Sequence, residues 1–524
     1  MMDGSDRTAA EKADGPQPEH WGPFGRPLFA DPAAKALARV GVVDVGSNSV
    51  RLVVFDGAAR SPSYFYNEKV MCGLGQGFTE TRRLHEDGKR RALAALKRFQ
   101  LLAENMGCAP LTAVATAAMR EAEDGPAFRR EVRETTGIKL WVIDGDEEAR
   151  LSAQGVLLGW PGAYGLVCDI GGSSMELAEL REGRVGKRAT APLGPFRLAG
   201  VPGGRKGLTV HIRAEIEKLM AAMGPQRDRL FLVGGSWRAI ARIDMARRGY
   251  PLAVLHEYRM SCDAVMETLA YISKKDADTL RAMTGIGEAR MALVPMAAAV
   301  LAEIVRQIAP HDIAVSSYGI REGMLYEQMP EELRARDPLI EACRFSEAKD
   351  ARLPGFGTLL YDFIAPLFQD GPAERQRIIQ AACLLHDVSW RAHPDYRHEV
   401  GFDYVTRGEL GGLRHEERVF LGLALLHRYK NSRSGTRLES ILGLLGEDEV
   451  RVAEILGKAM RFGAMLSVAA PDRMGTLDWS PGKARLTLRL AEGTEALFGE
   501  VAAARFQSLA QAMGAETKVV QPGG

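Results

Sequence analysis

The sequence predicts an α/β protein in which one structural unit is duplicated and a mainly helical region follows. As far as about residue 330, short apolar runs alternate with stretches of helical periodicity, as expected of strands that alternate with helices. The segment DVGSNSVRL at residues 44–52 returns as DIGGSSMEL at residues 169–177, and each copy lies between two apolar runs. This repetition indicates an internal duplication of a strand–turn–strand unit. Beyond about residue 335 helical stretches dominate.

These patterns divide the chain into four segments. Residues 1–38, rich in Asp, Glu, Gly, Pro and Lys, are expected to be a mobile tail. Residues 39–160 form the first α/β lobe and residues 161–334 the second. Residues 335–524 form the helical C-terminal domain, which the linker at residues 334–338 joins to the second lobe.

The individual elements follow from the spacing of apolar residues. In the first lobe we expect strands at residues 39–44, 50–55, 111–115 and 140–143 and helices at residues 86–103, 128–135 and 147–158. In the second lobe we expect strands at residues 165–169, 175–178, 229–233 and near residue 314, and helices at residues 237–248 and 321–329. In the C-terminal domain we expect helices at residues 359–368, 374–385, 416–429 and 450–466 and one strand at residues 484–490.

The composition excludes several classes of protein. Lys and Arg number 68 and Asp and Glu 67 among 524 residues, a net charge of +1, so we expect no basic field over the whole chain and no nucleic acid partner. A hydrophobic content of 46% excludes disorder over most of the chain. The six cysteines form no CxxC pair, which argues against a disulfide scaffold or structural zinc. No secretory signal and no stretch of about 18 uncharged apolar residues is present, so we expect a soluble cytoplasmic protein without a membrane partner.

The two repeated turns are candidate phosphate-binding sites. A glycine-rich turn between two strands presents backbone N–H groups that converge on an anion. The first residue of each repeat, Asp44 or Asp169, can hold Mg²⁺ or a water beside that phosphate. Ordinary hairpins with polar turns are the alternative, which the matching offsets disfavour. The candidate phosphate-binding residues are Gly46, Ser47, Asn48, Gly171, Gly172, Ser173, Ser174 and, in a third and weaker glycine turn, Gly235 and Ser236.

Acidic residues near the second turn suggest a cation site and a catalytic base. Glu176 pairs with Asp169 across the turn as a candidate for a hard cation rather than zinc, and a solvated strand residue is the alternative. Glu147 and Glu148 begin a helix, where the helix dipole alone favours a carboxylate, or where one could orient a nucleophilic water. Helical periodicity does not decide between Glu147 and Glu148. Arg120, after a strand, is either a phosphate clamp or a surface arginine.

The helical region carries histidines without a complete set of metal ligands. His386 and Asp387 are adjacent, and further histidines follow at positions 393, 398, 415 and 427. No histidine lies between His311 and His386, so an upstream ligand is missing, and packing or surface histidines are the favoured interpretation. Lys and Arg outnumber Asp and Glu over residues 375–437, which could line the path of a polyanion or form a solvated face.

Six segments together resemble the exopolyphosphatase / guanosine pentaphosphate phosphohydrolase (Ppx/GppA) family, in family order and near family spacing. They are DVGSNSVRL, ATAAMREA, DGDEEARL, CDIGGSSMEL, LVGGSWRAIAR and SSYGIREGML, within about residues 40–330. The family belongs to the actin, Hsp70 and sugar-kinase fold clan, so the resemblance implies two duplicated, ribonuclease H-like lobes. The rest of the chain is similar to the longer family members, which implies an all-α HD-like C-terminal domain.

The resemblance also implies roles for individual residues. Glu148, the second of the Glu-Glu pair, matches the family's catalytic glutamate, and Asp169 and Glu176 match its metal-associated acids. The two repeated turns match its phosphate-binding turns, and Arg120 matches the arginine of its third segment. The departures from the family pattern are Ser173 for Gly, Met175 for Thr, Asp124 for Asn, and Ser236-Trp237 for Thr and a small residue. Because the first HD histidine is missing, only the shape of that domain is carried over.

The implied function is an exopolyphosphatase that releases terminal orthophosphate from inorganic polyphosphate by Mg²⁺-assisted hydrolysis. Glu148 would orient or deprotonate the attacking water, and Arg120 would stabilise charge in the transition state. The alternatives are hydrolysis of guanosine pentaphosphate (pppGpp) to the tetraphosphate, a non-catalytic phosphate or nucleotide sensor, and a phosphotransferase of the same clan. The three acids Glu148, Asp169 and Glu176 argue against a sensor. The resemblance also allows a homodimer.

Overall fold

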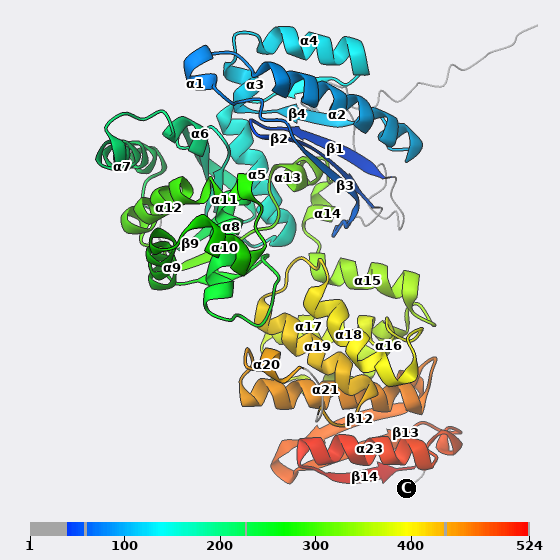
Figure 1. Ribbon diagram of the computed structural model, residues 1–524. Helices are drawn as coiled ribbons and strands as arrows, with labels where there is room; N and C mark the ends of the chain where they lie inside the picture. The colour runs from blue at the N-terminus through cyan, green and yellow to red at the C-terminus, as the bar shows by residue number, and fades with distance from the viewer. Residues whose placement is uncertain (1–38, 57–59, 226–227, 434–437, 522–524) are drawn as a thin grey trace, which may run out of the picture.

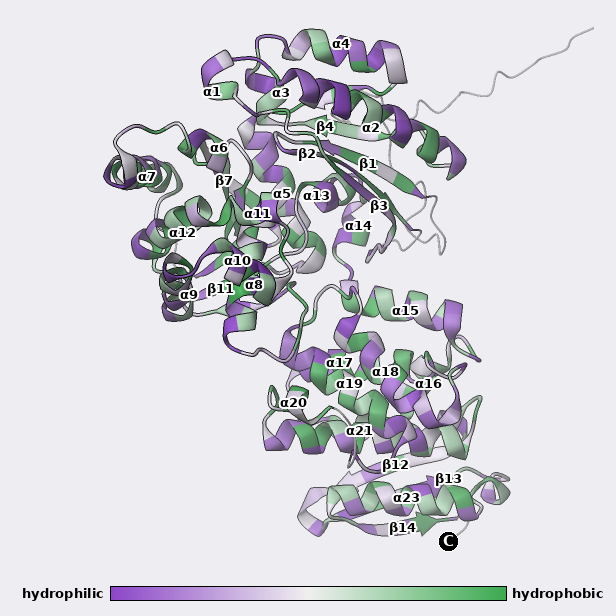
Figure 2. Ribbon diagram, viewed as in Figure 1, coloured by the Kyte–Doolittle hydropathy of each residue, from purple (hydrophilic) through white to green (hydrophobic). Residues whose placement is uncertain are grey.

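The computed structural model describes residues 39–521, except residues 57–59, 226–227 and 434–437. Figure 1 shows two α/β lobes side by side, in blue to cyan and in green, and a third region in yellow to red that extends away from them. The expected tail over residues 1–38 lies outside the described residues. In Figure 2 the helices carry both hydrophobic and hydrophilic stretches, as expected of helices with one face on a core.

The first lobe is built on a five-stranded sheet in the order β3-β2-β1-β4-β5. Strands β1, β2 and β3 are antiparallel, whereas β1, β4 and β5 are parallel. The strands are β1 (Val40–Val45), β2 (Ser49–Phe55), β3 (Tyr64–Met71), β4 (Thr112–Ala115) and β5 (Leu140–Val142). The helices are α1 (Phe78–Thr81), α2 (Glu86–Asn105), α3 (Ala117–Glu121), α4 (Gly125–Thr136) and α5 (Gly145–Gly159).

The second lobe repeats this sheet, which confirms the predicted duplication. Its six strands have the order β10-β11-β9-β6-β7-β8, so that β8-β7-β6-β9-β11 corresponds to β3-β2-β1-β4-β5. The strands are β6 (Gly165–Ile170), β7 (Met175–Arg181), β8 (Arg184–Ala191), β9 (Arg229–Val233), β10 (Arg259–Met260) and β11 (Asp312–Val315). The helices are α6 (Pro195–Leu198), α7 (Gly204–Met223), α8 (Gly235–Arg247), α9 (Cys262–Lys274), α10 (Ala277–Thr284), α11 (Glu288–Met291), α12 (Val294–Ile308) and α13 (Ile320–Glu327).

Helices α5 and α13 pack closely together and join the two lobes (Figure 1). A Cβ atom on Gly323 would lie 1.8 Å from the Leu151 carbonyl oxygen, and one on Gly155 would lie 2.3 Å from the Gly319 carbonyl oxygen. Glycine at these positions is therefore required for the close approach. One buried cluster contains side chains of both helices and of both sheets, so the lobes share a core at this junction. This core fixes where the first turn of each helix lies.

The C-terminal domain is helical in its greater part, as the sequence predicts, and ends in a small sheet. The sheet has the order β12-β13-β14, and of its strands only β13 was expected from the sequence. The expected all-α C-terminal domain therefore contains, in addition, a three-stranded sheet. After α14 (Glu331–Arg334), which ends the second lobe, the helices of the domain are α15 (Pro338–Asp350), α16 (Phe356–Ile364), α17 (Ala373–Leu385), α18 (Arg397–Arg407), α19 (His415–Tyr429), α20 (Glu439–Leu442), α21 (Glu447–Leu466), α22 (Pro471–Met474) and α23 (Glu500–Met513). The strands are β12 (Gly475–Ser480), β13 (Arg485–Leu490) and β14 (Glu516–Val520).

One stretch of the described chain, Glu288–Ile308, is long and apolar enough to cross a membrane. The sequence expectation considered only uncharged stretches and so did not include it. Most of its apolar window, 61%, is buried, and its α12 part lies in the hydrophobic core of the second lobe. Its apolar character is therefore accounted for as that of a core helix.

The C-terminal end of α5 is held by a fully buried arginine. Arg60 Nη1 and Nη2 donate hydrogen bonds to the carbonyl oxygens of Leu158 and Leu157 at 2.6 and 3.3 Å. Its Nε donates to the Arg336 carbonyl oxygen at 3.1 Å, in the linker before α15. The carbonyl groups at a helix end have no partner within the helix, and here a guanidinium supplies one. Arg60 therefore ties the first lobe, α5 and the linker together.

We expect Arg60→Met to lower the free energy of unfolding by about 3 kcal/mol, because buried carbonyl oxygens lose their donors. Arg60→Lys should restore little, since a single ammonium group cannot reach the same three acceptors. Denaturant unfolding measures both. Arg90→Met, on the exposed face of α2, is the matched control and should change stability by less than about 0.5 kcal/mol. An Arg60→Met protein as stable as this control would contradict the account.

Candidate active site

The two repeated turns face each other across a cavity of about 170 Å³ between the lobes. Each turn is closed by a backbone hydrogen bond, from Gly46 N to Ser49 O at 3.0 Å and from Gly171 N to Ser174 O at 2.9 Å. Most of the candidate site residues line this cavity. They are Asp44, Gly46, Ser47, Asn48, Glu148, Asp169, Gly171, Gly172, Ser173, Ser174 and Gly235.

The two turns touch across the cavity. The hydroxyl groups of Ser47 and Ser173 are 3.0 Å apart and share a hydrogen bond. Ser173 is one of the departures from the family pattern, so this contact depends on a side chain that a glycine would lack. A Cβ atom on Gly172 would lie 3.0 Å from the Phe196 ring and 3.1 Å from Ser47 Cβ, so the second turn leaves little room for a larger residue there.

The first turn of α5 separates the roles of Glu147 and Glu148. Asp144 caps the helix, because its side chain accepts a hydrogen bond from Glu147 N at 2.8 Å. The Glu147 carboxylate turns away and pairs with Arg150 at 2.6 Å. Glu148 is 5% exposed and lines the cavity. The geometry thus favours Glu148 as the glutamate that acts in the cavity.

The environment of Glu148 disfavours its ionised form. Burial and then the neighbouring carboxylates of Glu176 and Asp169 raise the pKa of Glu148 well above its usual range. Arg120 opposes this shift, with its Nη1 3.5 Å from Glu148 Oε2. Among the described residues, Glu148 Oε2 is buried and has no hydrogen-bond partner. This oxygen is therefore available to accept a hydrogen bond from a bound water or to approach a cation.

The carboxylates fit a hard cation. Asp169 and Glu176 are direct neighbours on β6 and β7, and burial raises the pKa of each. Burial also raises the pKa of Asp44, whose Oδ2 lies 3.7 Å from Arg321. Within the described part of the chain, no three such ligands lie close enough together to enclose an ion by themselves. Mg²⁺ commonly binds one or two carboxylates and completes its shell with waters and phosphate oxygens, so these oxygen donors suit it.

Three candidate residues do not line the cavity. Arg120 Nη1 donates to the Ile143 carbonyl oxygen at 2.7 Å and faces Glu148, so it contacts the carboxylate rather than the open cavity. Glu176 is the cross-strand neighbour of Asp169 and accepts a hydrogen bond from Thr190 Oγ1 at 3.2 Å. Ser236 is buried in the first turn of α8. Their contribution to the site is therefore indirect in this arrangement.

Five basic side chains line the cavity that the sequence analysis did not single out: Arg51, Lys69, Arg238, Arg290 and Arg321. Arg51, Arg238 and Arg321 lie within segments quoted for the family resemblance, so those segments carried the signal. Lys69 and Arg290 lie outside them, and among the described residues neither has an acidic or hydrogen-bonding side-chain partner. Burial, and then Arg290 and Arg51, lower the pKa of Lys69 to about 8. Such a cluster of cations is suited to a ligand with several negative charges.

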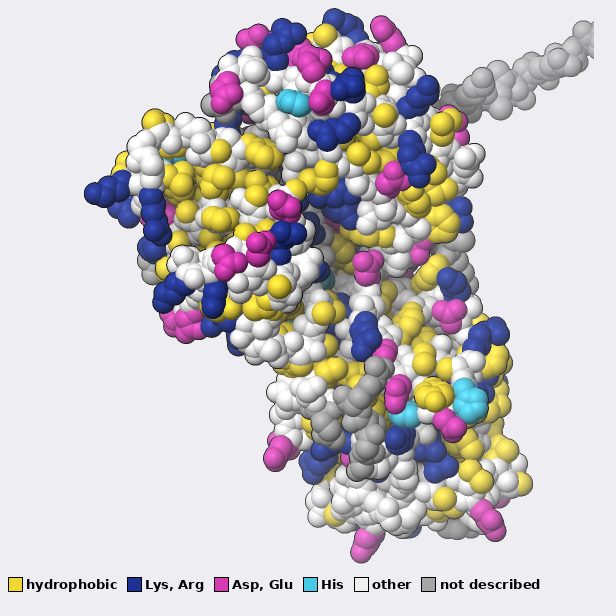
Figure 3. All heavy atoms as spheres, viewed as in Figure 1, with side chains coloured by type: hydrophobic (Ala, Val, Ile, Leu, Met, Phe, Trp, Pro, Cys, Tyr) yellow, Lys and Arg dark blue, Asp and Glu magenta, His cyan; other side chains and the backbone are white. Residues whose placement is uncertain are grey.

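A second cavity, of about 630 Å³, adjoins the first. Arg51, Gly235, Arg238, Arg290 and Ser317 line both, so the two cavities are adjacent and share these residues. The second cavity reaches the C-terminal domain at residues 407–410 and Arg418. Its charged lining contains six arginines and one acid, Glu409; the arginines are Arg51, Arg238, Arg242, Arg290, Arg407 and Arg418. Figure 3 shows basic side chains set back between the two lobes.

The adjacent His386 and Asp387 engage protein groups. His386 Nδ1 lies 2.8 Å from the Cys383 carbonyl oxygen. Asp387 accepts two hydrogen bonds from Arg352, at 2.6 and 2.7 Å. The guanidinium of Arg352 thus neutralises the carboxylate that would serve an HD-type metal site, and both residues act in packing the helical domain.

Comparison with known proteins agrees with this architecture. The chain matches the Ppx/GppA phosphatase family over residues 53–332 and the family described as exopolyphosphatase, C-terminal, over residues 363–520. Exopolyphosphatase 1 of Mycobacterium tuberculosis is 25% identical over 309 residues, which cover 56% of this chain and 89% of that protein. Retrograde regulation protein 2 of Saccharomyces cerevisiae is 24% identical over 439 residues, 74% of this chain and 72% of that protein.

Solved structures show the same fold. The crystal structure of an exopolyphosphatase from Cytophaga hutchinsonii superimposes with a TM-score of 0.50 at 23% identity and covers 56% of this chain and 97% of that one. This likeness supports the two-lobed, actin-like architecture that the duplicated sheets display. Because the family match at residues 53–332 spans more than half of the chain, the protein belongs to the Ppx/GppA phosphatase family.

Proposed function

We propose that this protein is an exopolyphosphatase, which hydrolyses the terminal phosphoanhydride bond of inorganic polyphosphate. The observation that carries the proposal is the convergence of five cations and three carboxylates on one cavity between the repeated turns. A phosphate chain is a compact polyanion, and a cluster of cations in which only Arg321 has an acidic ion-pair partner among the described residues suits it. The related exopolyphosphatases and the family assignment support the same chemistry.

In this proposal the terminal phosphoryl group lies in the smaller cavity and the rest of the chain extends into the larger one. The turns would contribute backbone N–H groups other than those of Gly46 and Gly171, which already donate to the carbonyl oxygens of Ser49 and Ser174. Arg51, Arg238 and Arg290 line both cavities, so they can contact successive phosphates. The arginines nearest to the C-terminal domain would bind only chains long enough to reach them. From the basic stretch at residues 375–437, Arg407 and Arg418 line this cavity, and the buried Arg418 donates its hydrogen bonds to backbone carbonyl groups.

The chemistry would be hydrolysis with Glu148 as general base. Its unpartnered Oε2 can accept the proton of the attacking water, and Arg120 beside it favours the ionised carboxylate. Arg238 and Arg321 line the cavity and can stabilise charge that develops on the phosphoryl oxygens. Asp169, together with Asp44 or Glu176, would hold Mg²⁺, which neutralises phosphate charge and orients the phosphoryl group when bound.

Guanosine pentaphosphate is the second candidate substrate, and one observation favours it. The larger cavity contains the aromatic rings of Tyr64 and Tyr318 and the acid Glu409 among its arginines. An aromatic ring can stack on a purine, and a carboxylate can accept hydrogen bonds from guanine N–H groups. Phosphate release from equal concentrations of polyphosphate and pppGpp would rank the two substrates.

The homodimer and the cytoplasmic location remain predictions of the sequence.

We expect Glu148→Gln to retain substrate binding and to lose at least about a thousandfold in kcat, because the amide cannot accept the proton of water. Glu147→Gln is the matched control, since that neighbour pairs with Arg150 outside the cavity. Phosphate release from polyphosphate in Mg²⁺ measures both rates. Wild-type turnover in Glu148→Gln, or an equal loss in Glu147→Gln, would contradict the assignment of the base.

Glu148→Gln should also stabilise the protein in the presence of a chelator. Because burial raises the folded-state pKa of Glu148 above its unfolded value, the wild type has full stability below the unfolded pKa and loses it as pH rises toward the folded pKa. The neutral variant lacks this loss, so its advantage should be larger at pH 8 than at pH 5 by about 1 kcal/mol or more. Thermal unfolding at both pH values measures this. If the stability gained by Glu148→Gln is the same at both pH values, ionisation of Glu148 does not destabilise the folded protein and the expectation is wrong. Adding Mg²⁺ should reduce the difference in stability between the variant and the wild type.

We expect Arg242→Gln to raise KM for long polyphosphate about three- to tenfold and to leave hydrolysis of tripolyphosphate within twofold, because Arg242 lines only the larger cavity. The difference in KM for long polyphosphate between Arg242→Gln and the wild type should become smaller at high salt, since an exposed charge is screened. Arg205→Gln, on α7 away from both cavities, is the control. Equal effects of Arg242→Gln on short and long chains would place the bound chain elsewhere.

A further inference from the structure

One wall of the larger cavity is a segment without helix or strand, residues 249–258 between α8 and β10. Residues 253–256 of this segment line the cavity. Leu252 is buried in the hydrophobic core of the C-terminal domain, although it belongs to the second lobe. The segment therefore both contacts the C-terminal domain and forms part of the cavity wall.

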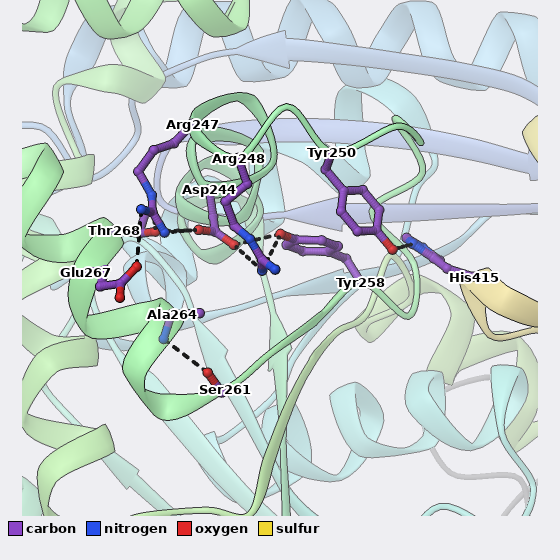
Figure 4. A network of polar contacts seen from close by, with 10 residues as sticks. All are labelled: Asp244, Arg247, Arg248, Tyr250, Tyr258, Ser261, Ala264, Glu267, Thr268 and His415. Carbon is purple, nitrogen blue, oxygen red and sulfur yellow. Dashed lines mark hydrogen bonds and ion pairs between the residues drawn. The ribbon is translucent and has the colours of Figure 1, made fainter. Parts of the chain in front are cut away.

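His415, the first residue of α19, makes polar contacts with this segment at two points. Its Nδ1 lies 2.9 Å from the Tyr250 hydroxyl and its Nε2 lies 3.1 Å from the His256 carbonyl oxygen. Figure 4 shows the Tyr250 and His415 side chains pointing toward each other from the two domains. A carbonyl oxygen only accepts, so Nε2 carries the proton, and Nδ1 of the neutral ring accepts the Tyr250 proton. Burial lowers the pKa of His415 to about 4, which agrees with a neutral ring.

The lobe side of this contact is held rigidly. The Tyr250 ring packs edge-on against Tyr258, with 4.8 Å between centroids. Tyr258 donates a hydrogen bond of 2.6 Å to Asp244, which is fully buried and also accepts bonds from Thr268 and Arg247 (Figure 4). Asp244 lies on α8, the helix that also brings Arg238 and Arg242 to the cavity. His415 is therefore connected to the helix that carries the cavity's arginines.

The first turn of α19 also contacts the opposite wall of the larger cavity, at residues 407–410. Arg418, three residues after His415, is 1% exposed. Its guanidinium donates hydrogen bonds to the carbonyl oxygens of Val405, Gly408 and Leu410, at 3.0, 2.8 and 2.6 Å. These acceptors belong to the end of α18 and the loop that lines the cavity from the C-terminal domain. The first turn of α19 therefore contacts both walls of the larger cavity.

We propose that His415 is a positioning residue for the extended part of the substrate: it fixes the wall at residues 249–258 and so sets the width of the larger cavity. His415 is not among the residues that line either cavity, so it acts through Tyr250 and the backbone of His256. The expected effect on binding of long chains rests on the proposed function, because the larger cavity would hold the chain beyond its terminal phosphoryl group. The expected effect on the position of residues 249–258 is independent of that function.

The test compares His415→Ala with Tyr250→Phe, which removes only the hydroxyl and keeps the ring on Tyr258. In the full chain, His415→Ala should raise KM for long polyphosphate about tenfold and change kcat on tripolyphosphate less than twofold. Tyr250→Phe should show a smaller effect of the same kind. His393→Ala, an exposed histidine of the same domain, is the control and should behave as wild type. Hydrogen exchange of the amides at residues 249–258 should accelerate in both variants and not in the control.

Unchanged exchange at residues 249–258 in His415→Ala would overturn the proposal. Faster exchange with an unchanged ratio of KM values for long and short chains would overturn its consequence for substrate. If His415→Ala does not fold, Tyr250→Phe decides by the same two measurements. If the wild type does not hydrolyse polyphosphate, the proposed function fails, and the exchange experiment still decides whether His415 fixes the wall.

Discussion

The close contact between α5 and α13 is the constraint on which the rest of the structure depends. Four backbone positions make it possible, because Gly155 and Gly319, and Gly323 and Leu151, meet where a Cβ atom would collide with a carbonyl oxygen. The contact fixes the first turn of each helix at the same cavity. The first turn of α5 supplies Glu148, and that of α13 supplies Arg321. One carboxylate and one cation are thus positioned at the cavity by a single packing interaction between backbones.

The electrostatics of the cavity follow from what this junction brings together. Buried carboxylates with raised pKa values and arginines held at short range are each unfavourable when alone. A bound cation would compensate the acids, and a phosphate chain would compensate the basic residues. Under the proposed function, the groups of this site would therefore reach their best partners only when cation and polyanion are both bound. This is the general expectation for a catalytic site that sacrifices stability for function.

The sequence was sufficient for the parts of the fold that repeat or that follow simple periodicity. The two Asp-x-Gly turns predicted the duplication, and the apolar spacing predicted β9 and the start of α2 to the residue. Strands β3 and β8 were missed: both are edge strands, no residue of β3 is fully buried, and most residues of β8 are exposed, so neither has the pattern of a buried strand. Sequence periodicity left Glu147 and Glu148 equivalent. Only the three-dimensional structure shows that one faces Arg150 and the other the cavity.

The cations Lys69 and Arg290 could not be found from local sequence, since they come from an edge strand and a four-residue helix and converge only through the tertiary fold. The same holds for His415, whose partners lie about 160 residues away in the chain. Interactions between domains leave no periodic trace in either segment. The sequence therefore indicated the chemistry of the turns, whereas the length and charge of the adjoining cavity required the structure.

In the proposed function, water attacks the terminal phosphoryl group of a polyphosphate chain that enters the site from one end. The most direct measurement is hydrolysis of long-chain polyphosphate in H₂¹⁸O with Mg²⁺, with the label located by mass spectrometry and chain length followed by gel electrophoresis. The account predicts ¹⁸O in the released orthophosphate and chains that shorten from their ends. Release of oligophosphates from internal cleavage, or orthophosphate without the label, would contradict it.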